Sequence, residues 1–186
     1  SILKLPFAYV NNGNEYYGFD LSEIINYIDN GRDVAIIVND IPYIKDLKRI
    51  LGDKCIALLV HRRNEIKLEY FLELARKRGD TDESARIRYE KAKQDQKALT
   101  NNISLFDQIV LNTENGNDER LLEILESFNK RKRINHTNSD TWTTKLYVFI
   151  GSPGSGKDEV LNMIKLQGIY HSVIIPKLTD RKRRNR

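Results

Sequence analysis

Cysteine is almost missing from this chain: Cys55 is the only one in 186 residues. One thiol can form neither an internal disulfide nor a cysteine-based zinc site, so both are excluded. Long apolar runs are missing too, since no stretch approaches the roughly 18 residues of a membrane helix and no secretory segment opens the sequence. Hydrophobic content is 40% and charged content is 31%, as in ordinary globular proteins. We expect a cytoplasmic protein of one domain, or one domain plus a fragment, without a membrane partner.

A general excess of one charge is also lacking. The formal net charge is +5, and the last ten residues, KLTDRKRRNR, account for all of it with six basic residues and Asp180. The rest of the chain is electrically balanced. Because the basic end has no interleaved aromatic residues, nucleic acid is not an expected partner.

Four short apolar runs predict buried strands, at residues 33–39, 55–60, 108–112 and 145–150. Their continuous apolar character is typical of a parallel sheet covered on both faces. Apolar residues at helical spacing lie between the runs, starting at Leu21, Leu68 and Leu121, with Asp20 or Ser22 as the cap of the first helix. The alternation of strands and helices predicts an α/β fold.

Two segments differ from this pattern. Residues 80–100 are highly charged with a thin apolar stripe, which predicts an exposed helix or a mobile flap. Residues 130–144 are rich in Asn, Ser and Thr without periodicity, which predicts a linker. This linker would divide a front segment, 1–129, from a back segment, 145–186.

The back segment carries the most specific signal, GSPGSGK at residues 151–157. It follows a predicted strand and precedes a predicted helix, which is the context of the G-x-x-x-x-G-K phosphate-binding motif. Backbone N–H groups of such a loop and the N-terminus of the helix face the same phosphate. The alternative is a glycine-rich turn with an incidental lysine. The candidate ATP-binding residues are Gly151, Ser152, Gly154, Ser155, Gly156 and Lys157.

The residue after the lysine departs from the motif. Ser or Thr normally stands there and ligates Mg²⁺, whereas this chain has Asp158, followed by Glu159. A carboxylate can hold Mg²⁺, so Asp158 is the candidate metal ligand and also a candidate ATP-site residue. Its charge is unfavourable beside phosphates unless the metal is bound.

The two segments resemble the two halves of guanylate kinases, in reversed order. NGNEYYGF (12–19), GRDVAIIVND (31–40), LELARKRGDTDESARIRYEKA (72–92) and FDQIVLN (106–112) are similar to the acceptor-binding turn, central strand, arginine-bearing lid and late strand of their second half. The phosphate loop and SVIIPKLTDRKRR (172–184) are similar to their first half. The resemblance implies a guanylate kinase-like P-loop fold of three layers around a mostly parallel sheet. The domain would be either circularly permuted or built from neighbouring kinase-like units, which implies association with a second copy or such a unit.

The resemblance also implies roles for individual residues. ATP and Mg²⁺ would be the cofactors, and a nucleoside monophosphate such as GMP, or a sugar phosphate, would be the acceptor. Lys157 and the lid residues Arg78 and Arg88 would act on the transferring phosphoryl group, and Asn112 would lie near the donor base. The acceptor would be held by Tyr17, Asn39, Arg181 and Arg184. The alternative to these roles is that the arginines are solvated surface residues and that Tyr17 packs in the core.

Several guanine-reading positions of the family are not retained. The base-reading Glu has no counterpart, because Pro6 or Phe7 stands there, and Leu74 replaces the first lid arginine. An acidic pair is replaced by Ile37 and Asn39, and a serine by Lys177. Ribose 1,5-bisphosphate phosphokinases resemble this chain at Asp158 and Asn39, so such an activity is one alternative. A non-catalytic module that binds nucleotide or protein is the other.

Overall fold

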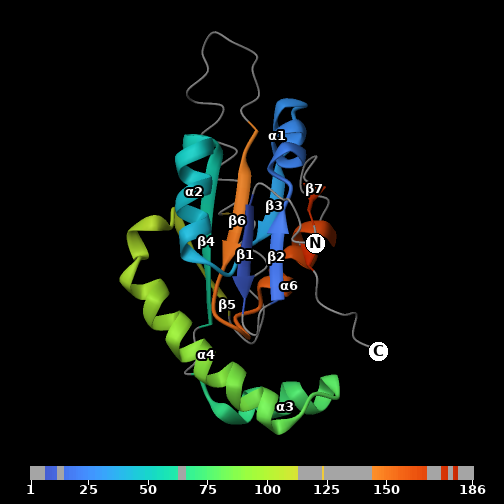
Figure 1. Cartoon of the computed structure of the whole chain (residues 1–186), viewed down its shortest axis with the longest axis vertical. Helices are drawn as coiled ribbons and strands as arrows, with labels where there is room; N and C mark the ends of the chain where they lie inside the picture. Colours follow the sequence, from blue (N-terminus) through green and yellow to red (C-terminus); the bar gives the residue numbers. More distant parts are fainter. Residues whose placement is uncertain are drawn as a thin grey trace.

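The computed structural model describes residues 7–11, 15–62, 66–112, 123, 144–166, 173–175 and 178–179 (Figure 1). In chain order the elements are β1 (Phe7–Asn11), β2 (Glu15–Phe19), α1 (Leu21–Asp29), β3 (Val34–Ile37), α2 (Ile41–Leu51), η1 (Gly52–Lys54), β4 (Cys55–Arg62), α3 (Leu68–Arg78), α4 (Asp82–Asn101), η2 (Ile103–Leu105), β5 (Gln108–Asn112), β6 (Leu146–Ile150), α6 (Lys157–Leu166), β7 (Val173–Ile174) and β8 (Leu178–Thr179). None of the helices within these ranges is long and apolar enough to cross a membrane.

Five strands form one parallel sheet in the order β5-β4-β6-β3-β7. The central strand β6 comes from the back segment, and its Leu146 lies opposite Val34 of β3 on one side and Cys55 of β4 on the other. The strand predicted at residues 145–150 is therefore confirmed as part of the same sheet as the strands of the front segment, and the chain is an α/β protein.

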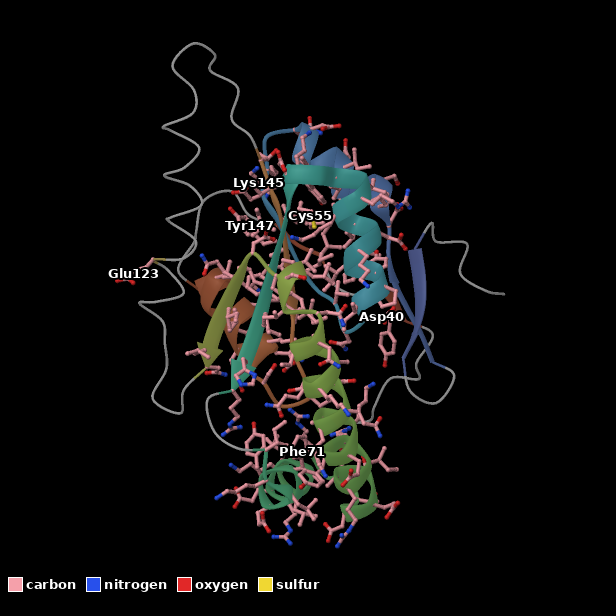
Figure 2. The ribbon with its side chains drawn as sticks, turned by 90° about the vertical axis from the view of Figure 1, so that its left-hand side faces the viewer. Asp40, Cys55, Phe71, Glu123, Lys145 and Tyr147 are labelled. Carbon is pink, nitrogen blue, oxygen red and sulfur yellow. The ribbon has the colours of Figure 1, made fainter. Side chains whose placement is uncertain are left out.

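Both faces of this sheet are covered, as the continuous apolar runs predict. Successive residues of β3 alternate: Val34 and Ile36 pack with α1 and α2, whereas Ala35 packs with α6. Figure 2 views the sheet nearly edge-on, with α2 on one side and α6 on the other. Burial of each large side chain contributes roughly 1.5–3 kcal/mol, so β6, buried along its whole length, is central to stability.

Polar contacts at the start of β6 fix its position between its neighbours. The Lys145 backbone N–H donates to Asp33 Oδ1 at 2.7 Å, and Lys145 Nζ donates to the Asp53 carbonyl oxygen at 2.6 Å. The preceding Thr144 is buried and its hydroxyl donates to the Ile28 carbonyl oxygen. Thr144 thus belongs to the packed body rather than to the predicted linker, whose other residues, 130–143, lie outside the described residues.

Three further strands form an antiparallel sheet in the order β1-β2-β8. The resemblance implied an acceptor-binding turn over 12–19. Residues 15–19 instead form the central strand of this sheet, paired on both sides, and residues 12–14 lie outside the described residues. Phe19 at its end is fully buried and stacks on Tyr43 of α2, with ring centroids 6.3 Å apart. The small sheet is joined to the main core through this contact.

Helices α3 and α4 form a hairpin at one end of the main sheet (Figure 1). Helix α3 ends because Gly79 takes the left-handed conformation at φ 69°. Helix α4 begins at the Thr81 cap, whose hydroxyl accepts from the Ser84 N–H at 3.2 Å, a contact that contributes about 1 kcal/mol. Phe71 packs between the two helices with Ala85 and Ala92 (Figure 2). Residues 80–100 therefore form a helix, one of the two alternatives the sequence left open.

Two other helix predictions have different outcomes. Asp20 is the cap of α1, because its carboxylate accepts from the Ser22 N–H at 2.9 Å. The Ser22 hydroxyl also donates to this carboxylate, and that contact is the main cause that lowers the pKa of Asp20. The helix predicted from Leu121 lies outside the described residues except for Glu123, which is helical and exposed. Helix α2 was not predicted.

Candidate functional site

The loop between β6 and α6 has the backbone that the phosphate-binding motif requires. Gly154 and Gly156 have positive φ angles of 79° and 89°, which favour glycine. Gly151 is needed for space, since a Cβ atom there would lie 2.3 Å from the Val60 carbonyl oxygen on β4. The Ser155 N–H bonds back to the Ser152 carbonyl oxygen at 3.1 Å. The loop is thus a tight turn at the carboxyl edge of the central strand.

Lys157, the first residue of α6, folds back over this loop. Its Nζ atom donates to the carbonyl oxygens of Gly151 at 2.7 Å and Ser152 at 2.9 Å. Burial lowers the pKa of Lys157 to about 8, although Asp158 and Asp95 favour its charged form. A cation at a helix N-terminus, beside a turn of backbone amides, is an arrangement suited to phosphate.

Asn112 holds the loop from the side. It ends β5 opposite Arg62 of β4, and its Nδ2 atom donates to the Ser155 carbonyl oxygen at 3.0 Å. A Cβ atom on Gly156 would lie 1.9 Å from Nδ2, so this contact requires glycine at that position. Asn112 was predicted near the donor base, and the structure places its amide against the loop backbone.

An aromatic pair on α3 covers the tip of the loop, which the sequence did not predict. A Cβ atom on Gly154 would lie 3.0 Å from Tyr70 Cε1 and 3.4 Å from Phe71 Cζ. The Tyr70 hydroxyl donates to the Gly154 carbonyl oxygen at 3.4 Å, and the Arg62 guanidinium carbon lies 3.8 Å from the Tyr70 ring centroid. The helical hairpin is thereby in contact with the loop.

The two predicted lid arginines occupy other positions. Arg88 Nη1 pairs with Asp80 Oδ2 at 2.8 Å, a contact within the helical hairpin. Arg78 is exposed in the last turn of α3. In this conformation the ion pair with the largely buried Asp80 carboxylate, 16% exposed, holds Arg88 to its own hairpin.

Asp40, Lys91 and Asp95 form a charged cluster that interacts electrostatically with Lys157, and this cluster was not predicted. Lys91 and Asp95, one turn apart on α4, pair at 3.4 Å. Burial raises the pKa of Asp95, and both Lys91 and Lys157 oppose this change. Burial likewise raises the pKa of Asp40, which interacts with Lys91 and Asp95. One residue of the cluster could have been located from the sequence: Asp40 follows the strand predicted at 33–39 and therefore lies at the carboxyl edge of the sheet.

The structure describes two of the four residues predicted to bind the acceptor. Tyr17 of β2 lies opposite Thr179 of β8, two residues before Arg181. Asn39 lies two residues after the end of β3, the neighbour of β6, and so lies at the same carboxyl edge as the phosphate loop. Arg181 and Arg184 lie outside the described residues.

Asp158 is exposed in the first turn of α6. The described part of the chain contains no group of three or more metal-ligating side chains. Mg²⁺ bound with a nucleotide normally takes one or two carboxylates, waters and substrate phosphates. A single carboxylate beside the loop fits that mode of binding, whereas a cage made only of protein ligands does not fit.

No family model, no curated protein and no solved structure matches the chain. Its function is therefore inferred from the site itself: a glycine loop at the edge of a central parallel strand, a lysine folded over it, and charged side chains of α4 beside it.

Proposed function

We propose that the protein is an ATP-dependent phosphotransferase acting on a small phosphorylated acceptor, with a guanylate kinase-like P-loop fold in permuted order. The observation that carries the proposal is Lys157 Nζ, held on the carbonyl oxygens of Gly151 and Ser152 at the mouth of the loop. Among the described residues, Lys157 Nζ donates hydrogen bonds only to carbonyl oxygens of its own loop. Phosphate oxygens can replace these acceptors, because charged acceptors form the stronger hydrogen bonds.

The donor ATP would lie on the loop amides and on the N-terminus of α6. Mg²⁺ held by Asp158 would neutralise charge that develops on the phosphates. Phosphoryl transfer needs little covalent chemistry from the protein, and positioning with charge compensation provides most of the catalysis. The residues of this chain would bind the donor, orient it and exclude water from the transferring group.

The acceptor would lie along Asn39 and the β2–β8 pair. Pairing of Tyr17 with Thr179 supports this location, because it brings the Tyr17 strand next to the segment that continues to Arg181 and Arg184. Planar guanidinium groups suit the oxygens of a phosphomonoester. Asn39 and Lys177 can bond a sugar or base but do not replace a carboxylate that accepts from guanine. Each unmet group costs about 1–3 kcal/mol, so strict preference for GMP is not expected.

A second candidate is a non-catalytic module that binds nucleotide or protein. The pairing of Arg88 with Asp80 favours this candidate, since it leaves one predicted catalytic cation within the helical hairpin.

An ADP-release assay with ATP and Mg²⁺ tests the proposal, using GMP, the other nucleoside monophosphates and ribose bisphosphates as acceptors. We expect acceptor-dependent release that Lys157→Ala abolishes. Lys165→Ala, on the exposed last turn of the same helix, is the matched control and should keep the activity. ATP binding without turnover on any acceptor would contradict the kinase proposal and favour the non-catalytic module. Turnover confined to GMP would contradict the predicted loss of guanine preference, and turnover confined to ribose bisphosphates would support the alternative sugar-phosphate activity.

A further inference from the structure

Lys91 is one of the more enclosed lysines of α4. Its side chain is 25% exposed, as is that of its partner Asp95. Lys93, two residues later, is 52% exposed and pairs with Glu90, whose side chain is 59% exposed. Helix α4 therefore turns Lys91 and Asp95 inward and Lys93 outward.

Helix α4 packs beside the nucleotide site. Ala92, next to Lys91, packs with Phe71, whose Cζ atom would lie 3.4 Å from a Cβ atom on Gly154 of the loop. Asp95 accepts from Lys91 Nζ at 3.4 Å, and its negative charge also favours the charged form of Lys157. Asp40 approaches the same pair from the end of β3, and Figure 2 shows it at the foot of α2 beside α4. The helical hairpin thus brings its own cation to the carboxyl edge of the sheet.

In the absence of a ligand, the ammonium groups of Lys91 and Lys157 are offset by the carboxylates of Asp40 and Asp95, and Asp158 adds a further negative charge near Lys157. Burial makes the ionised carboxylates costly, as the raised pKa values of Asp40 and Asp95 indicate. A phosphate anion can take over the two lysines from Asp95, because it offers more acceptor oxygens to the same donors. The cluster is therefore suited to exchange an internal carboxylate for an external phosphate.

Resting on the proposed function, we propose that Lys91 is a second phosphate-binding cation of this site and acts on the terminal phosphate of ATP. The loop amides surround the inner phosphates, and Lys157 reaches the β- and γ-phosphates. Lys91 approaches from α4, a separate element, and so contributes chiefly to the phosphate that ATP has and ADP lacks. It takes the role that the resemblance assigned to Arg78 and Arg88, which the structure places elsewhere.

Isothermal titration with ATP and with ADP, both with Mg²⁺, tests the assignment without knowledge of the acceptor. For Lys91→Ala we expect roughly tenfold weaker ATP binding and ADP binding within about twofold of wild type. Lys91→Arg should keep most of the ATP affinity, and Lys93→Ala should bind both nucleotides like wild type. Equal losses for ATP and ADP, or no loss for either, would overturn the assignment.

Lys91→Ala removes a cation and also leaves the Asp95 carboxylate without its partner Lys91. Asp95→Asn separates these two effects. This variant should bind ATP more tightly, since it removes a negative charge that competes for both lysines. Adding Lys91→Ala to Asp95→Asn should again weaken ATP selectively, and an unchanged affinity would show that Lys91 does not contact the phosphate. A wild-type protein that binds neither nucleotide would contradict the proposed function itself, whereas normal wild-type binding with an inert Lys91 contradicts this inference alone.

Discussion

Asn112 and Ser155 are 43 residues apart in the sequence, yet Asn112 Nδ2 donates to the Ser155 carbonyl oxygen at 3.0 Å. The contact joins the end of β5, at one edge of the sheet, to the loop that follows the central strand β6. The phosphate loop is therefore held by a side chain of the front segment as well as by its own glycines. This contact makes the conformation of the loop dependent on the association of the two segments.

Replacing Asn112 by Asp should loosen the loop. A carboxylate oxygen would then face the Ser155 carbonyl oxygen in place of the donor, at a cost of about 1–3 kcal/mol. We expect a lower thermal midpoint and weaker ATP binding, measured by calorimetry. Asn162→Asp, the same change on the exposed side of α6, is the control and should alter neither. Equal effects of the two variants would show that the Asn112 contact is unimportant.

Gly156→Ala should impair the loop more than Gly31→Ala impairs its own turn. Both glycines have positive φ angles, 89° and 77°, so both substitutions strain the backbone by about 1–2 kcal/mol. Only at Gly156 would the new Cβ atom also meet Asn112 Nδ2, at 1.9 Å. Chemical denaturation and ATP titration of both variants measure the difference. Similar losses of stability in the two would contradict the close approach of Asn112.

ATP affinity should fall at alkaline pH. Burial lowers the pKa of Lys157 to about 8, so the free protein loses this proton above that pH while phosphate binding requires it. Affinity should be nearly constant below pH 8 and then decline by up to about tenfold per pH unit. Titrations from about pH 7 to about pH 9.5 measure this decline, with Lys157→Ala as the control. A wild-type profile as flat as that of the variant would contradict the assignment of Lys157.

Phe149→Ala should destabilise the whole fold. Phe149 lies in the central strand and is fully buried, so its truncation should lower the free energy of unfolding by about 3–5 kcal/mol. Ile109→Ala is the control on β5, because its side chain is 40% exposed and should cost much less. Urea denaturation monitored by circular dichroism compares the two. A small effect of Phe149→Ala would indicate that β6 is not an integral part of the sheet.

The main sheet could be predicted because its signals are local. Runs such as residues 55–60 and 146–150 have no charged side chain, and short runs of that composition are typical of strands buried on both faces. Their order in the sheet is not local information. Complementarity of the two segments predicted that residues 145–150 join the front sheet, which the pairing confirms, but the position of β6 between β3 and β4 was not predicted.

The elements that were missed depend on distant partners or on a misleading local residue. Strand β2 contains Gly18, and its pairing with β8 joins residues near opposite ends of the chain. Helix α2 carries Pro42, which suggests a break but is tolerated in the first turn of a helix.

The candidate site likewise has one part that could be predicted from the sequence and another part that could not. The glycine loop and Lys157 are contiguous and carry their own spacing rule, so the sequence identifies them. Tyr70 and Lys91 reach the site only because the α3–α4 hairpin folds toward the loop. Arg88 was assigned by resemblance, and its pairing with Asp80 across the hairpin turn could not be read from the sequence.

The central claim is that the Gly151–Lys157 loop binds ATP, and calorimetric titration of ATP with Mg²⁺ tests it most directly. We expect wild-type protein and Lys165→Ala to bind with the same affinity. Lys157→Ala should bind at least about tenfold more weakly, because it removes a charged donor from the phosphates. Equal affinities of wild type and Lys157→Ala, or no ATP binding by the wild-type protein, would contradict the account.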